Sequence, residues 1–314
     1  MARRRPVLFA RTRVHETGQP LPRLDRVRAV IFWLADPLRE LYPEDYAEAS
    51  EIARRAEAAG ARIINPPDTL SNTIKSVQAR LWQQAGIPCA PCEAFRDRAE
   101  LEAVVARTAF PAIVRTDLHH AQEQTYVCAT AEQALKVPAE GRLYPGVVLS
   151  FIDTRAGYEA ARPGTIWARS FHKKRSFIYG DVVVPNHTLF ADSPVVGLNR
   201  SVFRRYKGNR AILSPLAYLR RWHRDALDVD RSFAEAAPEH RELFVRANRA
   251  LGLDFGAVDY STLADGSIVL WEINPYFSMP VGNKGFLAGP RRLAARNRRN
   301  YDAMETYFEG LIGG

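Results

Sequence analysis

The sequence predicts an α+β fold in which a small α/β unit precedes hairpins and separate helices. An apolar run, a helical pattern and a second apolar run follow one another within residues 27–66, as in a strand–helix–strand unit. Two later segments, 175–190 and 254–276, each read as two strands joined by a short turn that contains Gly and Asp. Helical periodicity returns between these hairpins and after the second one. Together these patterns favour sheets built from hairpins in the larger part of the chain.

Composition places the chain among ordinary soluble globular proteins. It has 314 residues, 46% of them hydrophobic and 25% charged, which suggests two domains or one large domain with subdomains. The longest apolar stretches have the length of strands, so no membrane span is expected. The first residues are basic but lack the apolar region of a signal peptide, and we therefore expect a cytoplasmic protein.

Charge and cysteine content narrow the choice of partners. The net charge of +9 favours acidic partners such as nucleotides, phosphates, carboxylates or nucleic acid, although an Arg-rich bulk composition explains it equally well. Three cysteines do not suggest a disulfide framework. Cys89 and Cys92 form a CxxC between prolines, but no second cysteine pair could complete a zinc site. We expect neither a redox nor a metal role for them.

The first third of the chain carries clear element signals. The run VRAVIFWL, residues 27–34, predicts a buried strand, and a helix is expected from Pro43 to Ala59, where Gly60 ends it. ARIINPP then predicts a second strand. The next helix has N-cap candidates at 71–73, apolar residues at helical spacing, and Gly86 and Pro88 as stop signals.

The rest of the chain alternates strands and helices. Strands are expected at 110–116, 126–130 and 146–153, with a helix from Ala131. The segment 175–190 predicts two strands about a turn at Gly180 and Asp181. Residues 194–227 show no regular pattern. Two helices complete the prediction, one at 238–252 with Pro at its start and Gly at its end, and an amphipathic terminal helix at 291–312.

The hairpin at 254–276 places acidic residues where strands seldom carry them. Asp265-Gly266 predicts a two-residue type I′ turn, in which Ala264 pairs with Ser267. That register puts Asp259 directly opposite Glu272, and Asn274 lies on the same face as Glu272. Facing carboxylates repel, whereas a divalent cation between them turns the repulsion into attraction.

Three oxygen-bearing side chains on one face suit Mg²⁺ or Mn²⁺ better than zinc. The alternative is a solvated hairpin whose acids face water or arginines. Asn274, the apolar opposite face and Pro275 favour the metal site. Because Mg²⁺ keeps few protein ligands and shares the rest with phosphates, the residues predict a magnesium–nucleotide site.

The residues around this hairpin resemble the ATP-grasp superfamily, nearest its glutathione-synthetase and RimK-like ligases. LGLDFGAVDYSTLADGSIVLWEINP (251–275) is similar to that family's metal-binding hairpin, KKRSFIYGDVVV (173–184) to its Arg-containing strand pair, and KSVQARLWQQAGIPCAP (75–91) to the helix that opens its nucleotide-binding region. FPAIVRT (110–116) resembles the strand that carries the phosphate-binding lysine, and GVVLSFID (146–153) falls at the interdomain hinge. The resemblance covers roughly residues 60–280.

The resemblance implies site residues. It implies Asp259, Glu272 and Asn274 as metal ligands, and Arg175 and Arg115 as groups that grip phosphate or acyl phosphate. It implies Lys75, Arg115 and Arg175 as nucleotide-binding residues, with adenine bound at the hinge. The hinge residues are Ser150, Phe151, Ile152 and Asp153.

The resemblance also implies an architecture and a reaction. Residues 1–70 would form a small α/β pre-ATP-grasp domain, followed by the ATP-grasp N-subdomain at 71–154 and the C-subdomain at 155–314, which together clasp ATP. The implied cofactors are ATP and Mg²⁺ or Mn²⁺. The implied activity is that of a carboxylate–amine ligase: ATP phosphorylates a carboxylate, and an amine displaces phosphate with release of ADP. Such chemistry requires positioning and charge rather than a nucleophile on the enzyme.

In two places the sequence departs from the segments that bind phosphate in the family. Arg115 stands where the family has lysine, which keeps the charge and changes the geometry. The family's glycine-rich loop corresponds to TDLHHAQEQTYV, residues 116–127, which contains no glycine. Glycine lets backbone amides approach phosphates closely. His119 and His120 could donate hydrogen bonds or reach the substrate there, or be ordinary loop residues.

Other functions stay open at this stage. The alternatives are an ATP-grasp phosphotransferase and a nucleotide-binding protein whose altered loop no longer supports turnover. Nucleic-acid binding through the Arg-rich terminal helix ranks last, because no groove-reading or stacking motif accompanies it. The expected partners are ATP and a small-molecule or peptide carboxylate with an amine, without a membrane; a homodimer is compatible with the sequence. Substrate walls are expected at Tyr276, Phe277, Asn283 and Lys284, where ordinary packing or a surface loop is an equal alternative.

Overall fold

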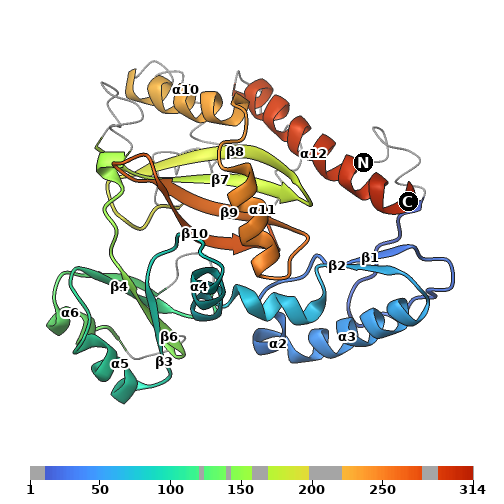
Figure 1. Ribbon diagram of the computed structural model, residues 1–314, viewed down its shortest axis with the longest axis horizontal. Helices are drawn as coiled ribbons and strands as arrows, with labels where there is room; N and C mark the ends of the chain where they lie inside the picture. The colour runs from blue at the N-terminus through green and yellow to red at the C-terminus, as the bar shows by residue number, and fades with distance from the viewer. Residues whose placement is uncertain are drawn as a thin grey trace.

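Three β-sheets organise the described part of the chain (Figure 1). The computed structural model describes residues 11–119, 124–138, 143–157, 169–197, 221–277 and 289–313. One sheet is a small parallel pair, and each of the other two has four strands that pair antiparallel. The α+β class predicted from the sequence is therefore confirmed.

The N-terminal sheet belongs to the strand–helix–strand unit. Its two strands lie in parallel register, with Ala29 opposite Arg62. The connecting helices cover it, and Ala56 of the longer helix is fully buried beside Leu24 and Ala61. The elements are β1 (Ala29–Ile31), α2 (Leu38–Leu41), α3 (Pro43–Ala58) and β2 (Arg62–Ile64).

The second sheet has the strand order β3-β6-β4-β5. Two helices pack on one of its faces through a core that includes Phe95, Leu101 and Val114. The elements are β3 (Cys92–Phe95), α5 (Arg98–Val105), β4 (Ala112–Thr116), β5 (Thr125–Cys128), α6 (Ala131–Leu135) and β6 (Gly146–Ser150). In Figure 1 this unit lies at the lower left.

The third sheet has the order β10-β9-β7-β8 and is covered on both faces. Ile178, Val258 and Tyr260 face a core that includes Phe244 of α11. Phe177 and Phe255, on the other face, pack with Met304 and Phe308 of α12. The elements are β7 (Phe171–Tyr179), β8 (Val182–Ala191), α10 (Arg221–Glu235), α11 (Arg241–Ala250), β9 (Phe255–Thr262), β10 (Ile268–Asn274) and α12 (Gly289–Gly313).

A short helical linker joins the three units at the centre of the molecule (Figure 1). The 3₁₀ helix η1 (Pro67–Thr73) leads into α4 (Lys75–Gln84). The indole of Trp82 donates to the carbonyl of Ala247 in α11 at 3.0 Å, and Gln78 Oε1 accepts the N–H of Ile273 at 2.9 Å. These bonds fix α4 against the third sheet while its first turn faces the second sheet.

The start of α4 differs from the prediction. Residues 71–73 were expected to supply the N-cap, but they belong to η1, and Thr73 Oγ1 donates back to Leu70 at 2.7 Å. The cap comes from a distant residue: Asp117, after β4, accepts the N–H of Ser76 at 2.9 Å and its hydroxyl at 2.6 Å. A carboxylate at a helix start also suits the helix dipole.

The turn of the β9–β10 hairpin also differs from the prediction. Leu263 accepts the N–H of Gly266 at 3.0 Å and donates to Ser267 at 2.7 Å, so the loop has three residues and Gly266 takes a φ of 82°. Thr262 therefore pairs with Ile268, one register step away from the two-residue turn. The expected type I′ turn, with Ala264 opposite Ser267, is wrong; the Asp-Gly sequence instead forms a turn with a left-handed glycine at its third position.

A β-bulge restores the predicted pairing at the site. The register shifts between Leu270 and Glu272, so Trp271 is an extra residue and Glu272 lies opposite Asp259. A second shift lies in β8, where His187 pairs with Arg175 and Pro185 pairs with Ser176. Bulges re-aim side chains and often lie beside functional sites. Both bulges here adjoin the same row of residues.

Most other predicted elements are present with adjusted ends. The strand predicted at 27–34 is shorter, and the helix predicted from Pro238 begins at Arg241, after His240 in a left-handed conformation. The terminal helix is confirmed. Of the unpatterned stretch 194–227, residues 198–220 lie outside the described chain. Among the described helices, none is both long enough and apolar enough to cross a bilayer.

Candidate functional site

A single row of polar residues crosses all four strands of the third sheet. His187 of β8 pairs with Arg175 of β7, Arg175 with Asp259 of β9, and Asp259 with Glu272 of β10. Directly opposed residues on neighbouring strands point to the same face, so these four side chains share one surface. Asn274 follows Glu272 by two positions on that face. We call His187, Arg175, Asp259 and Glu272 the polar row.

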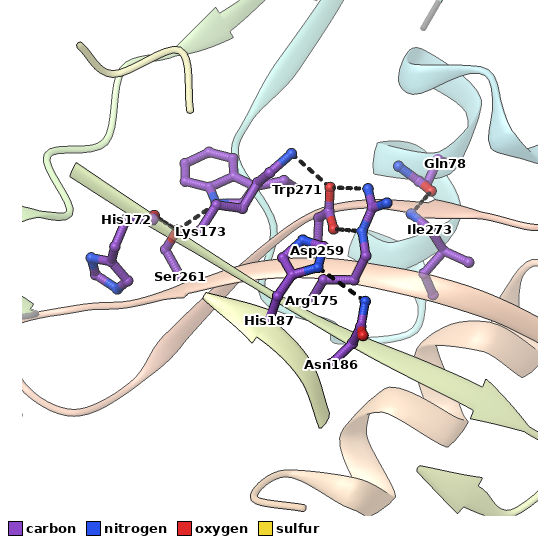
Figure 2. A network of polar contacts seen from close by, with 10 residues as sticks. All are labelled: Gln78, His172, Lys173, Arg175, Asn186, His187, Asp259, Ser261, Trp271 and Ile273. Atoms are coloured by element: carbon purple, nitrogen blue, oxygen red, sulfur yellow. Dashed lines mark hydrogen bonds and ion pairs between the residues drawn. The ribbon is translucent and has the colours of Figure 1, made fainter. Parts of the chain in front are cut away.

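Asp259 is the buried centre of this row (Figure 2). Its two carboxylate oxygens accept from Arg175 at 2.5 and 2.8 Å, and Lys173 Nζ lies 2.7 Å from one of them. Burial alone would raise the pKa of Asp259, but the charges and hydrogen bonds of Arg175 and Lys173 outweigh it and hold the pKa well below its usual value. The carboxylate is therefore ionised and fully paired.

Glu272 lies between cations from three elements. It is half-buried, and its negative charge opposes the lowering of the pKa that burial causes at Lys75 in α4, Arg115 in β4 and Arg175 in β7. The second and third sheets thus bring these charges within reach of one carboxylate. Burial lowers the pKa of Arg115, and its Nε is buried without a hydrogen-bond partner among the described residues. The structure therefore brings together Lys75, Arg115, Arg175 and Glu272.

Lys75 is buried at the junction of α4 and the second sheet. Its ammonium donates to the carbonyls of Asp117 at 3.0 Å and His119 at 2.9 Å. Burial and the charge of Arg115 lower the pKa of Lys75 to about 8, against the opposing charges of Glu272 and Asp117. The lysine therefore holds the chain after β4 in place at the edge of the site.

Lys75 gives stability a measurable pH dependence. Its pKa falls from 10.5 to about 8 in the folded protein, so the unfolded chain binds more protons between these values and stability should rise with pH there. Lys75→Met removes this titration. We expect the free energy of unfolding of the wild type, relative to that of Lys75→Met, to increase by about 2 kcal/mol between pH 8 and pH 10. Urea denaturation at both pH values measures it.

The matched control is Lys136→Met, which removes a lysine from the surface of α6. Its stability difference from the wild type should stay constant over the same range. A difference for Lys75→Met that does not change with pH would contradict a buried, proton-releasing Lys75.

The hinge residues follow β6 and lead out of the second sheet. Ser150 ends that strand and donates its N–H to Pro91 at 3.0 Å. The ring of Phe151 meets Phe171 edge-on with centroids 6.2 Å apart, and Ile152 lines a mainly apolar pocket with Cys89 and Val269. Asp153, by contrast, forms an exposed ion pair with Arg155. Their role in binding adenine stays a prediction.

The oxygen donors on the site face fit Mg²⁺ in kind. Glu272, Asn274 and Asp259 offer carboxylate and amide oxygens on one side of a hairpin. Asp259, however, is occupied by two cations, and no cluster of three or more His, Cys, Asp or Glu side chains within the described chain is placed to hold a metal. A metal at this face would be held by Glu272 and Asn274, and phosphate oxygens would have to supply other ligands.

Several residues of the site were not found from the sequence. Lys173 could have been, because it precedes Arg175 by two positions and must share its face. His187 and Trp271 could not, because their places depend on the bulges in β8 and β10. Trp271 donates from its indole to Ser261 Oγ at 2.7 Å (Figure 2).

The two loop histidines and the residues expected to line the substrate site differ in where the structure places them. His119 contributes its backbone carbonyl to Lys75, and His120 lies outside the described residues. Phe277 is part of the core, stacked on Phe177 at a centroid distance of 4.7 Å, which supports the packing alternative for it. Tyr276 is exposed. Asn283 and Lys284 lie outside the described chain.

Comparison with known proteins finds similarity in structure alone. No protein-family model and no curated protein matches the chain. Among solved structures, the chain is similar to the ATP-grasp ligase PsnB in complex with a precursor variant, Mg and ADP. The two are 17% identical with a TM-score of 0.45, over 81% of this chain and 69% of that one.

Two further matches are also enzymes. The chain is similar to the VanG D-Ala:D-Ser ligase from Enterococcus faecalis, at 12% identity and a TM-score of 0.47 over 85% of this chain and 69% of that chain. It is also similar to N5-carboxyaminoimidazole ribonucleotide synthetase from Thermotoga maritima, at 13% identity and a TM-score of 0.41 over 74% and 48%. At these identities the likeness concerns the fold, and function is argued from the site.

Proposed function

We propose that this chain is an ATP-grasp enzyme that joins a carboxylate to an amine at the expense of ATP, with ADP and phosphate as products. The observation that carries the proposal is the meeting of Lys75, Arg115, Arg175 and Glu272, three cations and one carboxylate from two sheets and a helix. Such an arrangement suits a polyphosphate whose charge increases at the transferred group.

Each element of the site has a role in this reaction. A carboxylate oxygen of the substrate attacks the γ-phosphorus of ATP, and ADP leaves as an acyl phosphate forms. The amine then attacks the carbonyl carbon, and phosphate leaves as the amide forms. Arg175 and Arg115 would grip the transferred phosphoryl group, since guanidinium groups bind phosphate oxygens in pairs.

Mg²⁺, held by Glu272 and Asn274, would neutralise charge on the β- and γ-phosphates. Asp259 pairs with Arg175 and Lys173. Phosphate oxygens would compete with Asp259 for these two cations. Its carboxylate could then join the metal ligands, as the sequence predicted. Asp259 thus links the cations that bind phosphate to the residues that bind metal.

A product assay tests the reaction class. The protein is incubated with MgATP, hydroxylamine and each member of a panel of amino acids, dicarboxylates and short acidic peptides. Hydroxylamine is a small amine that converts an acyl phosphate into a hydroxamate, which ferric iron then turns into a coloured complex. We expect hydroxamate, ADP and phosphate in equal amounts for at least one carboxylate. AMP and pyrophosphate would contradict the proposal, as would a phosphorylated product without free phosphate, which a phosphotransferase would give.

A further inference from the structure

His187, at the β8 end of the polar row, has no role in the reaction described above. Its ring is half-buried, and its Nδ1 lies 3.0 Å from Nδ2 of Asn186. Asn186 Oδ1 in turn accepts from Asn300 Nδ2 of α12 at 3.1 Å. Because an amide nitrogen only donates, Nδ1 of His187 is the acceptor and the ring proton is on Nε2. Figure 2 shows the ring beside Arg175 and Asp259.

The surroundings of His187 keep it neutral and favour anions. Burial, together with the charges of Arg175, Arg296 and Lys173, lowers the pKa of His187 well below its usual value, and Asp259 opposes this only in part. The imidazole is thus an uncharged donor in a positive environment. Nε2 of His187 makes no hydrogen bond within the described chain, so its N–H is available to a ligand.

Arg296 of α12 is the second donor at this end of the row. One of its terminal nitrogens pairs with Asp230 at 3.0 Å, and Asp230 accepts the backbone N–H of Thr188, which adjoins His187. The Nε of Arg296 is buried and has no hydrogen-bond partner among the residues that the structure describes. An oxyanion that accepted from it would satisfy this donor at short range.

Distance separates this pair from the metal-binding end. His187 and Glu272 lie on the two edge strands of a four-stranded sheet, and neighbouring strands are about 4.8 Å apart, so roughly 14 Å separates their backbones. His187 therefore lies on the opposite side of Arg175 from Glu272 and Asn274. Arg175 lies between the two ends and can contact a group from either side.

We propose that His187 and Arg296 form an anion subsite for the carboxylate substrate, on the side of Arg175 away from the metal-binding residues. His187 Nε2–H and Arg296 Nε–H each donate to an oxygen of a substrate carboxylate, and Asn186 and Asn300 orient the imidazole for this. The inference rests on the proposed function, because it identifies the place of the carboxylate in that reaction. A neutral donor suits this subsite because it orients the carboxylate oxygen without the strong attraction that a third cation, beside Arg175 and Arg296, would add.

Nitrogen NMR of the histidine rings tests the subsite with acetate as the probe. Protein labelled with ¹⁵N-histidine is examined at pH 7 in the presence of MgADP, and His187→Gln identifies the signals of His187. We expect the Nε2–H tautomer, and a saturable shift of its Nε2 signal as acetate replaces chloride at constant ionic strength. The Nδ1–H tautomer would overturn the proposal, as would a signal that acetate and chloride affect alike.

Two variants separate a direct contact from a general charge effect. Arg296→Lys keeps the charge and the pair with Asp230 but removes the Nε–H, and it should weaken acetate binding at least fivefold. Arg298→Lys, in the same helix, should leave it unchanged. Equal acetate affinity in Arg296→Lys and the wild type would overturn the role of Arg296.

Calorimetry with MgADP distinguishes failure of the proposed function from failure of the anion subsite. A protein that binds no MgADP would contradict the proposed function. A protein that binds MgADP normally, with no effect of acetate on His187, would overturn the anion subsite alone.

Discussion

Replacing Asp259 with alanine should lower the free energy of unfolding by about 3–5 kcal/mol, because the variant leaves two cations in a buried place without a counter-charge. Arg175 and Lys173 both pair with Asp259, whose side chain is fully buried. Chemical denaturation at pH 7 measures the loss. The effect also depends on pH. Because the pKa of Asp259 is lower in the folded protein than in the unfolded chain, its contribution to stability is fully present above the ordinary carboxyl pKa. This contribution is lost as the pH falls towards the lowered pKa.

Two comparisons make this result specific. Asp265→Asn changes an exposed acid in the same hairpin and should cost less than about 1 kcal/mol. Replacing the whole cluster, as Lys173→Met/Arg175→Met/Asp259→Leu, should restore most of the lost stability, since an apolar cluster needs no counter-charge. An Asp259→Ala protein within 1 kcal/mol of the wild type would show that the carboxylate does not compensate these cations.

Glu272→Gln should reduce ATP turnover by about 100- to 1,000-fold while leaving the protein folded. Glu272 is half-buried at an edge strand, so the amide fits the same space with little loss of packing. What is lost is the negative charge that faces Lys75, Arg115 and Arg175 and that would hold the metal. Release of ADP with a carboxylate and hydroxylamine measures the effect, alongside a thermal melt.

The matched control for Glu272 is Glu242→Gln, on the exposed side of α11, which should keep the wild-type rate. Substantial turnover by Glu272→Gln would remove the basis for assigning the metal to this hairpin. Asp259 and Glu272 are thus expected to differ in kind: loss of the buried one first reduces stability, and loss of the half-buried one first reduces turnover.

The sequence was sufficient for the charged face of the hairpin but not for its turn. The pairing of Asp259 with Glu272 is confirmed, although the turn is one residue longer than predicted and a bulge at Trp271 offsets the difference. Local patterns do not reveal a bulge, because it depends on how the strand is held by its neighbours. Here Leu270 donates to Pro88 and Ile273 donates to Gln78, contacts that no local signal contains.

Long-range contacts account for the other differences. The cap of α4 comes from Asp117, which lies 41 positions after Ser76, so the local Ser and Thr residues gave the wrong prediction. His187 reaches the polar row only because β8 shifts its register beside Arg175. Lys173, by contrast, follows from simple alternation along β7. Strand alternation and hairpin pairing could be read from the sequence, whereas bulges and distant caps required the folded chain.

In the proposed reaction the substrate carboxylate is activated as an acyl phosphate. The most direct measurement uses a carboxylate that forms hydroxamate, labelled with ¹⁸O in both carboxyl oxygens, together with unlabelled MgATP. We expect one ¹⁸O in the released phosphate and none in the nucleotide, because the attacking oxygen stays on phosphorus when the amine displaces phosphate from the carbonyl carbon. Label in AMP, or none in phosphate while amide forms, would contradict it.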